Sequence, residues 1–219
     1  MGRVALPHDA AAGPTKPEVR AVALSKLRLE PSDHLVDVGA CTGAVTIEAA
    51  RRAGRVTAIE RDRDRAVVAR KNLAANDVTA DVEVRRATAP DGLPDRADAL
   101  FLGGSRDFEA VLDAAPSMGV GRFVMNVARL EVAARAVEAV RERGYLDGVL
   151  HLQVNRGYDL AGATGFEAGD PVYLIVGRIE SAADDGEDVD DETGYPGDSD
   201  GGDATGDDAD PNGSGEGPT

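Results

Sequence analysis

The sequence contains a single cysteine, Cys41, among its 219 residues. One cysteine excludes an internal disulfide and any metal site built from several thiolates. No run of 18 apolar residues occurs, so no membrane-spanning helix is expected. The N-terminal segment MGRVALPHDAAAGPT is interrupted by Pro7, His8 and Asp9 and lacks the continuous apolar stretch of a signal peptide. These absences predict a soluble, cytoplasmic protein without a membrane partner.

Basic residues are missing from the C-terminal segment, residues 181–219. This segment holds 14 Asp and Glu and no Lys or Arg, whereas residues 1–180 hold 26 acidic and 24 basic residues. Its apolar content is too low to offset the entropy of ordering, so we predict a disordered acidic tail after one domain over residues 1–180. A self-repelling tail that favours solubility is preferred over an interaction arm for a basic partner. Because the domain has no basic cluster, no nucleic-acid partner is expected.

Strand-like and helix-like apolar patterns alternate from about residue 16 onward. Buried strands are predicted over residues 34–39, 55–60, 81–87, 97–104 and 121–127. Two further strands, within residues 146–157 and 171–180, are separated by a glycine-rich loop with no room for a helix, so they form a hairpin. The predicted fold class is α/β, with a doubly wound, mostly parallel, seven-stranded sheet, a reversed edge strand and an antiparallel C-terminal hairpin.

The first predicted strand runs into a glycine loop, Gly39-Ala40-Cys41-Thr42-Gly43, that precedes a helix. Glycines allow the backbone to approach a ligand, and the helix offers free N–H groups. Glu60 ends the second strand about 20 residues further on, where a carboxylate can accept both hydroxyls of a ribose. The loop matches neither the G-x-G-x-x-G pattern of NAD sites nor the G-K-[ST] of a P-loop. S-adenosylmethionine is therefore the cofactor that fits best.

The chain also contains, in this order, the segments GPTKPEVRAVALSKL, VDVGACTGAVTIEAA, VTAIERD, ATAP, LFLGGS and DPVYLIVG. Together they resemble the cobalt-precorrin-6B C15-methyltransferase (decarboxylating) family of the anaerobic cobalamin pathway, over about residues 13–177. The resemblance implies a Rossmann-like methyltransferase that uses S-adenosylmethionine to methylate a corrinoid precursor at C15. It also implies loss of the C12 acetate carboxyl, giving cobalt-precorrin-7, and a homo-oligomer, in this family a homotetramer.

Carried over by position, the resemblance assigns cofactor contacts to Thr15, Gly39, Ala40, Cys41, Thr42, Gly43, Glu60 and Ala89. Glu60 would bind the ribose, and the segment around Ala89 would flank the adenine. Two residues depart from the family pattern: Cys41 replaces the usual glycine, and Thr88 replaces a frequent aspartate. If position 41 requires φ > 0, cysteine costs on the order of 1 kcal/mol or more there. A non-enzymatic protein with a decayed cofactor site is therefore one alternative.

A corrinoid precursor carries many carboxylates, which arginine binds in a bidentate manner. The candidates at the expected end of the sheet are Arg106, Arg129 and Arg156, to which Lys16 and Arg20 could add.

No catalytic residue is assigned, because methyl transfer mainly requires in-line placement of the methyl group and its acceptor. The macrocycle itself can take up the electrons of the decarboxylation. His8, His34 and His151 are interpreted as structural or solvated. A tRNA methyltransferase is a second alternative, which would require a basic face and usually an N-P-P-[YF]-like motif where this chain reads LGGSR.

Overall fold

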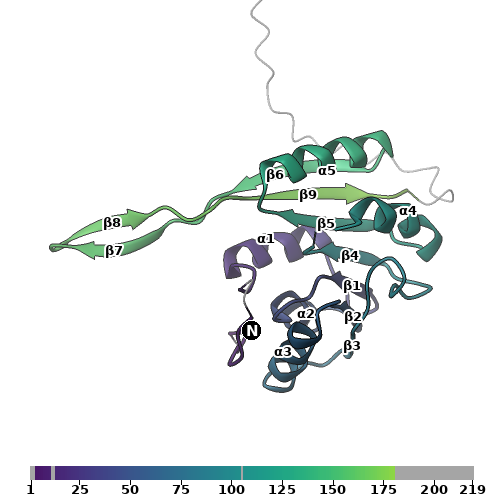
Figure 1. The fold of residues 1–219 in the computed structure, drawn as a ribbon, viewed down its shortest axis with the longest axis horizontal. Helices are drawn as coiled ribbons and strands as arrows, with labels where there is room; N and C mark the ends of the chain where they lie inside the picture. The colour runs from purple at the N-terminus through teal and green to yellow at the C-terminus, as the bar shows by residue number, and fades with distance from the viewer. Residues whose placement is uncertain (1–2, 11–12, 105, 181–219) are drawn as a thin grey trace, which may run out of the picture. The chain divides into compact units, whose positions relative to one another are not determined.

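The computed structural model describes residues 3–10, 13–104 and 106–180. In this part of the chain, helices cover both faces of a seven-stranded sheet (Figure 1). The described helices are α1 (Pro17–Leu27), α2 (Ala44–Ala49), α3 (Arg63–Ala74), α4 (Phe108–Met118) and α5 (Leu130–Glu142). The strands are β1 (His34–Val38), β2 (Arg55–Ile59), β3 (Asp81–Arg85), β4 (Ala99–Leu102), β5 (Arg122–Val127), β6 (Leu146–Leu152), β7 (Arg156–Leu160), β8 (Ala163–Glu167) and β9 (Val172–Arg178). The predicted acidic tail lies outside the described residues.

The strands of the large sheet follow the order β3-β2-β1-β4-β5-β9-β6. All neighbours pair in parallel except β9, which runs antiparallel to both β5 and β6. The predicted doubly wound, mostly parallel sheet is confirmed, but the reversed strand is not at the edge. β9 is apolar and largely buried, so it suits an inner position, whereas β6 alternates between exposed and half-buried residues, as an edge strand can.

The glycine-rich loop predicted between the last two strands is itself structured. β7 and β8 pair as a separate two-stranded antiparallel sheet, joined by Ala161 and Gly162 with φ of 52° and 83°. Two consecutive residues with positive φ match the twist of a tight hairpin. This arm had no apolar burial pattern to reveal it, because nearly every residue in it is exposed. The segment predicted as a glycine-rich loop therefore contains a hairpin of its own.

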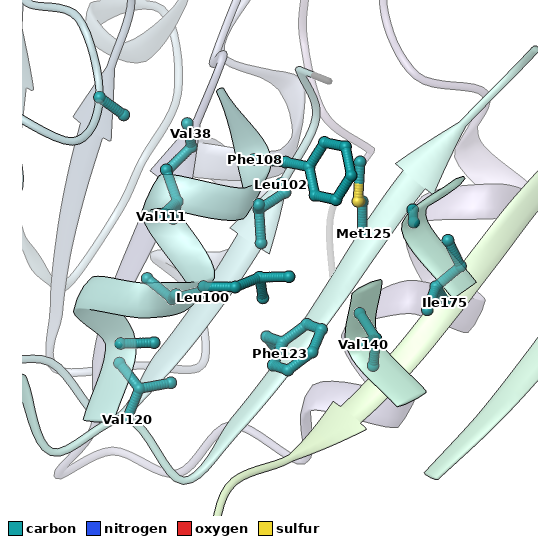
Figure 2. Packing of buried hydrophobic residues seen from close by; sticks show 14 of the residues in the cluster. Val38, Leu100, Leu102, Phe108, Val111, Val120, Phe123, Met125, Val140 and Ile175 are labelled. Carbon is teal, nitrogen blue, oxygen red and sulfur yellow. The ribbon is translucent and has the colours of Figure 1, made fainter. Parts of the chain in front are cut away.

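Alternating side chains divide the core into two layers. Leu100 and Leu102 of β4 face α4, where they join Phe108 and Val111 (Figure 2). Phe101 faces the opposite side, in the layer that contains α1 and α2. With both faces covered, the carboxyl ends of the parallel strands are where a ligand can reach the sheet.

Among the described residues, no helix combines the length and the apolar character needed to cross a bilayer.

Candidate active site

A cavity of about 460 Å³ lies at the carboxyl ends of the parallel strands. β1 pairs with β2 on one side and with β4 on the other, so the strand order reverses here, as expected for a ligand site in a doubly wound sheet. Most of the predicted site residues line this one cavity: Thr15, Gly39, Ala40, Cys41, Thr42, Glu60, Ala89, Arg106 and Arg129.

The glycines of the loop shape it in different ways. Gly39 has φ of 86°, and a Cβ on it would lie 2.9 Å from the backbone nitrogen of Gly104, so the β1 and β4 loops could not approach this closely with another residue. Gly43 precedes α2 with φ of 77°, and a Cβ there would lie 3.3 Å from Cα of Ala69. Gly43 lies outside the cavity lining, so it positions the loop on α3 rather than facing the cavity.

Cys41 adopts the left-handed conformation that its position was suspected to require, with φ of 51°. For a residue with a Cβ this costs about 1–2 kcal/mol. Its backbone N–H donates to Oε2 of Glu60 at 3.0 Å, and its Sγ lies 3.8 Å from the carbonyl oxygen of Gly13. Burial raises the pKa of the Cys41 thiol, so the sulfur stays protonated at neutral pH and is a poor nucleophile.

Glu60 is 4% exposed, and backbone N–H groups hold both of its carboxylate oxygens. Oε1 accepts from the Asp62 nitrogen at 2.9 Å, and Oε2 accepts from Cys41. A carboxylate has about four acceptor positions, so each oxygen can still accept a hydroxyl from a ligand. The carboxylate predicted from its spacing is thus fixed against the glycine loop.

Asp37 is a site residue that the sequence reasoning missed. It lines the cavity from within β1 and is 1% exposed. Its Oδ2 accepts from the Thr46 hydroxyl at 2.6 Å, whereas its buried Oδ1 has no hydrogen-bond partner among the described residues. Burial raises the pKa of Asp37 to about 6, and the negative charge of Glu60 adds to this, whereas the Thr46 hydrogen bonds oppose it. An acid inside the apolar run LVDVG was the signal that could have identified it.

Asn126, on β5, is a second missed residue with an unsatisfied buried oxygen in the same cavity lining. Buried polar atoms are nearly always hydrogen-bonded, so these two oxygens, which have no partner among the described residues, can accept hydrogen bonds from a water molecule or from a ligand in the cavity.

The predicted basic residues separate into two groups. Arg106 and Arg129 line the cavity, but Arg156 lies on the β7–β8 arm and pairs with Glu18 at 2.7 Å. The Lys16 ammonium donates to the carbonyl oxygen of Asp170 at 2.8 Å. Arg20 is 5% exposed, because its guanidinium holds Glu48 at 2.8 Å and the carbonyl oxygen of Thr15. Arg156, Lys16 and Arg20 therefore join elements of the fold instead of lining the cavity.

Two further arginines, Arg61 and Arg65, line the cavity beside Glu60. The stretch ERDRDR after β2 was the available signal, since it places cations directly after the candidate ribose acid. Within the described residues, none of the four cavity arginines forms an ion pair with a carboxylate. Their charges are available to an anionic ligand.

The histidines lie away from the cavity lining. The His34 Nε2 is 2.8 Å from the Thr57 hydroxyl, and burial lowers the pKa of this imidazole. The His151 ring packs 5.0 Å from the ring of Tyr173. In the described part of the chain, no group of three or more His, Cys, Asp or Glu side chains could hold a metal ion.

The reversed β9 inside a parallel sheet, the glycine loop after β1 and the acid after β2 define a Rossmann-like methyltransferase.

Comparison with known proteins then narrows the class. A family model described as "Precorrin methyltransferase domain" matches residues 7–177. A relative from Halobacterium salinarum, named "Probable cobalt-precorrin-6B C(15)-methyltransferase (decarboxylating)", is 61% identical over 177 residues, which cover 81% of this chain and 95% of the relative. The chain belongs to the precorrin methyltransferase family.

Solved structures agree with this assignment. Precorrin 8W decarboxylase from Methanobacterium thermoautotrophicum superposes with a TM-score of 0.73 at 28% identity, covering 78% of this chain and 96% of that one. Precorrin-6y C5,15-methyltransferase from Geobacter metallireducens gives a TM-score of 0.71 at 35% identity, covering 78% and 94%. The matches favour a precorrin methyltransferase over the tRNA methyltransferase alternative.

Proposed function

We propose that this enzyme uses S-adenosylmethionine to methylate C15 of cobalt-precorrin-6B and removes the C12 acetate carboxyl, giving cobalt-precorrin-7. The carrying observation is the cavity itself, where Glu60 and the glycine loop meet beside an unsatisfied buried carboxylate oxygen of Asp37. The 61% identical relative carries the name of this activity.

The cavity fits the proposed cofactor in three respects. Its volume of about 460 Å³ falls in the range of small-molecule sites. Glu60 can accept the ribose hydroxyls, and the free Oδ1 of Asp37 can accept the ammonium of the methionine part. Thr88 and Ala89, after β3, line the same cavity, which supports assigning the adenine to this segment. When bound, S-adenosylmethionine supplies an electrophilic methyl group.

The cavity arginines provide the charge that a carboxylate-rich substrate needs. Arg106 and Arg129 follow β4 and β5, on the opposite side of β1 from Arg61 and Arg65. We assign substrate carboxylates to Arg106 and Arg129, because guanidinium groups bind carboxylates in a bidentate manner. The residues of this chain then act by holding and orienting the two reactants.

The β7–β8 arm supports a homo-oligomer, proposed as a tetramer. Tyr158, Leu160 and Phe166 are 49%, 55% and 70% exposed on one short arm, and exposed apolar side chains gathered in a patch can mark a contact with another protein surface. Light scattering would test this. The molar mass of the parent protein should exceed that of a monomer, and the double variant Leu160→Ser with Phe166→Ser should have a lower molar mass than the parent. A monomeric parent would refute the proposal. A cytoplasmic location and the absence of a nucleic-acid partner remain predictions.

A mass-spectrometric assay with cobalt-precorrin-6B and S-adenosylmethionine tests the proposed reaction. The expected product is one methyl group heavier and one carbon dioxide lighter than the substrate. Cofactor binding without turnover would indicate another methyl acceptor. Failure to bind S-adenosylmethionine at micromolar concentration would support the alternative of a decayed site at Cys41 and Thr88.

A further inference from the structure

Asn72, on α3, is a fully buried polar residue that joins two separate segments of the chain. Its Oδ1 accepts from the backbone nitrogen of His8 at 3.0 Å, and its Nδ2 donates to the His8 carbonyl oxygen at 2.8 Å. The same Nδ2 donates to the carbonyl oxygen of Thr42, in the glycine loop, at 2.9 Å. Asparagine is unfavourable inside helices and uncommon in cores, so these three hydrogen bonds identify its role at this position.

The His8 contact belongs to a longer attachment of residues 3–10, called here the N-terminal segment. Asn76, two residues beyond the end of α3, binds the backbone of Ala5 in the same way. Its Oδ1 accepts from the Ala5 nitrogen at 3.0 Å, and its Nδ2 donates to the Ala5 oxygen at 2.7 Å. Two asparagine side chains therefore hold the N-terminal segment along α3.

The chain that follows the N-terminal segment reaches the wall of the cavity. Gly13, Pro14 and Thr15 line the cavity, and the Gly13 carbonyl oxygen contacts the Cys41 sulfur. The chain that follows the N-terminal segment thus forms part of the same wall as the glycine loop.

The glycine loop rests on the same face of α3. Gly43 approaches Ala69 so closely that a Cβ would lie 3.3 Å from its Cα, and Ala69 is one turn before Asn72. Thr42 is 2% exposed, and within the described residues the Asn72 amide is the group that donates to its carbonyl oxygen. α3 therefore holds the loop by one close packing contact and one hydrogen bond.

We propose that Asn72 is a positioning residue of the cofactor site, which fixes the glycine loop relative to the N-terminal segment so that both respond together to bound cofactor. This inference rests on the proposed S-adenosylmethionine function. Asn76 performs only the first half of this task, because its side chain contacts the N-terminal segment, the Asn72 carbonyl oxygen and Arg51, and not the loop. The two asparagines thus form a matched pair.

The test compares Asn72→Ala with Asn76→Ala in the full-length protein. Calorimetry measures the Kd for S-adenosylmethionine, and hydrogen exchange follows residues 3–10 and 39–43 with and without the cofactor. Both variants should speed exchange of the N-terminal segment in the free protein. Only Asn72→Ala should also speed exchange of the loop and raise Kd about tenfold or more, because it leaves the buried Thr42 oxygen unpaired. Bound cofactor should slow exchange at His8 in the parent but no longer in Asn72→Ala.

A second variant, His8→Pro, breaks the same hydrogen bond by changing the exposed residue, so loss of folding is not expected. It removes the N–H that Asn72 accepts and should raise Kd by less than Asn72→Ala does. Equal loop exchange and equal Kd in the Asn72 and Asn76 variants would overturn the inference while leaving the proposed function intact. A parent protein that binds no cofactor would refute the proposed function, and the loop exchange in the free variants would still decide the role of Asn72.

Discussion

The cavity at the carboxyl ends of the strands and the β7–β8 arm place polar and apolar groups in opposite ways. Around the cavity, the carboxylates of Asp37 and Glu60 are buried, and Glu60 is held by backbone N–H groups. On the arm, Tyr158 and Phe166 face water, and the link to α1 is the Arg156–Glu18 pair, whose side chains are 61% and 43% exposed.

This difference indicates what each region can do within one chain. A buried carboxylate interacts strongly with a charged or polar ligand because little water screens it. An exposed ion pair contributes about 0–1 kcal/mol, and an exposed apolar surface gains stability only when something covers it. Substitutions around the cavity should therefore have large effects on binding, and substitutions in the arm small effects on stability.

Replacing Glu60 should produce the largest loss. Glu60→Ala removes the proposed ribose acceptor and leaves the Cys41 and Asp62 N–H groups without it, so we expect the Kd for S-adenosylmethionine to rise about 100-fold or more. Calorimetry would measure this, with the exposed Glu83→Gln as the control. An unchanged Kd for Glu60→Ala would remove Glu60 from the site.

Asp37 should make cofactor binding depend on pH. Its pKa in the free protein is raised by burial to about 6, and pairing with an ammonium would lower it, so binding releases a proton below that pH. We expect Kd to increase about tenfold from pH 7 to pH 5, and Asp37→Asn to flatten this dependence.

Lowering the pH, which should weaken cofactor binding, should by contrast increase the folding stability of the free protein. The folded pKa of Asp37 lies above the ordinary value of an aspartate, so the folded state binds the proton more tightly than the unfolded chain does. Stability should therefore fall as pH rises from about 4 to about 6, and Asp37→Asn should lessen that fall in denaturant titrations. A Kd in the parent that does not change with pH would exclude an ionised Asp37 as the ammonium acceptor.

Cys41→Gly should stabilise the protein, with an effect smaller than those predicted for Glu60 and Asp37. Glycine removes the strain of φ at 51°, but it also increases the entropy of the unfolded chain, so the net stabilisation should be about 0.5–1 kcal/mol. Thermal unfolding would show a higher Tm than for Cys41→Ala, which retains a Cβ. A lower Tm for the glycine variant would mean that the cysteine side chain stabilises the loop by more than its backbone strain costs.

Arg156→Ala should have the smallest effect. Its ion pair with Glu18 is largely exposed, so stability should remain within about 0.5 kcal/mol of the parent and the Kd for S-adenosylmethionine should not change. Denaturant titration and calorimetry would measure both. The position of Arg156 on the arm argues against contact with the substrate. If Arg156→Ala abolished turnover in the cobalt-precorrin-6B assay, Arg156 would have to be a substrate residue after all.

The success of the sequence predictions followed the range over which each residue acts. The glycine loop and Glu60 were predicted from local turn chemistry and a regular spacing, and the structure brings them together in one cavity. The ion pairs of the candidate substrate residues Arg20 and Arg156 could not be predicted, because their partners, Glu48 and Glu18, are brought close only when distant segments pack together.

The sequence by itself determined the alternation of strands and helices, the glycine loop and the acid that follows the second strand, since apolar periodicity and turn chemistry are properties of neighbouring residues. Only the tertiary structure decided which polar groups became buried. Strand pairing placed β9 inside the sheet, buried Asp37 with a free oxygen, and brought His8 and Thr42 to the same side chain of α3. Burial depends on what packs against a residue, and those neighbours come from segments far apart in the chain.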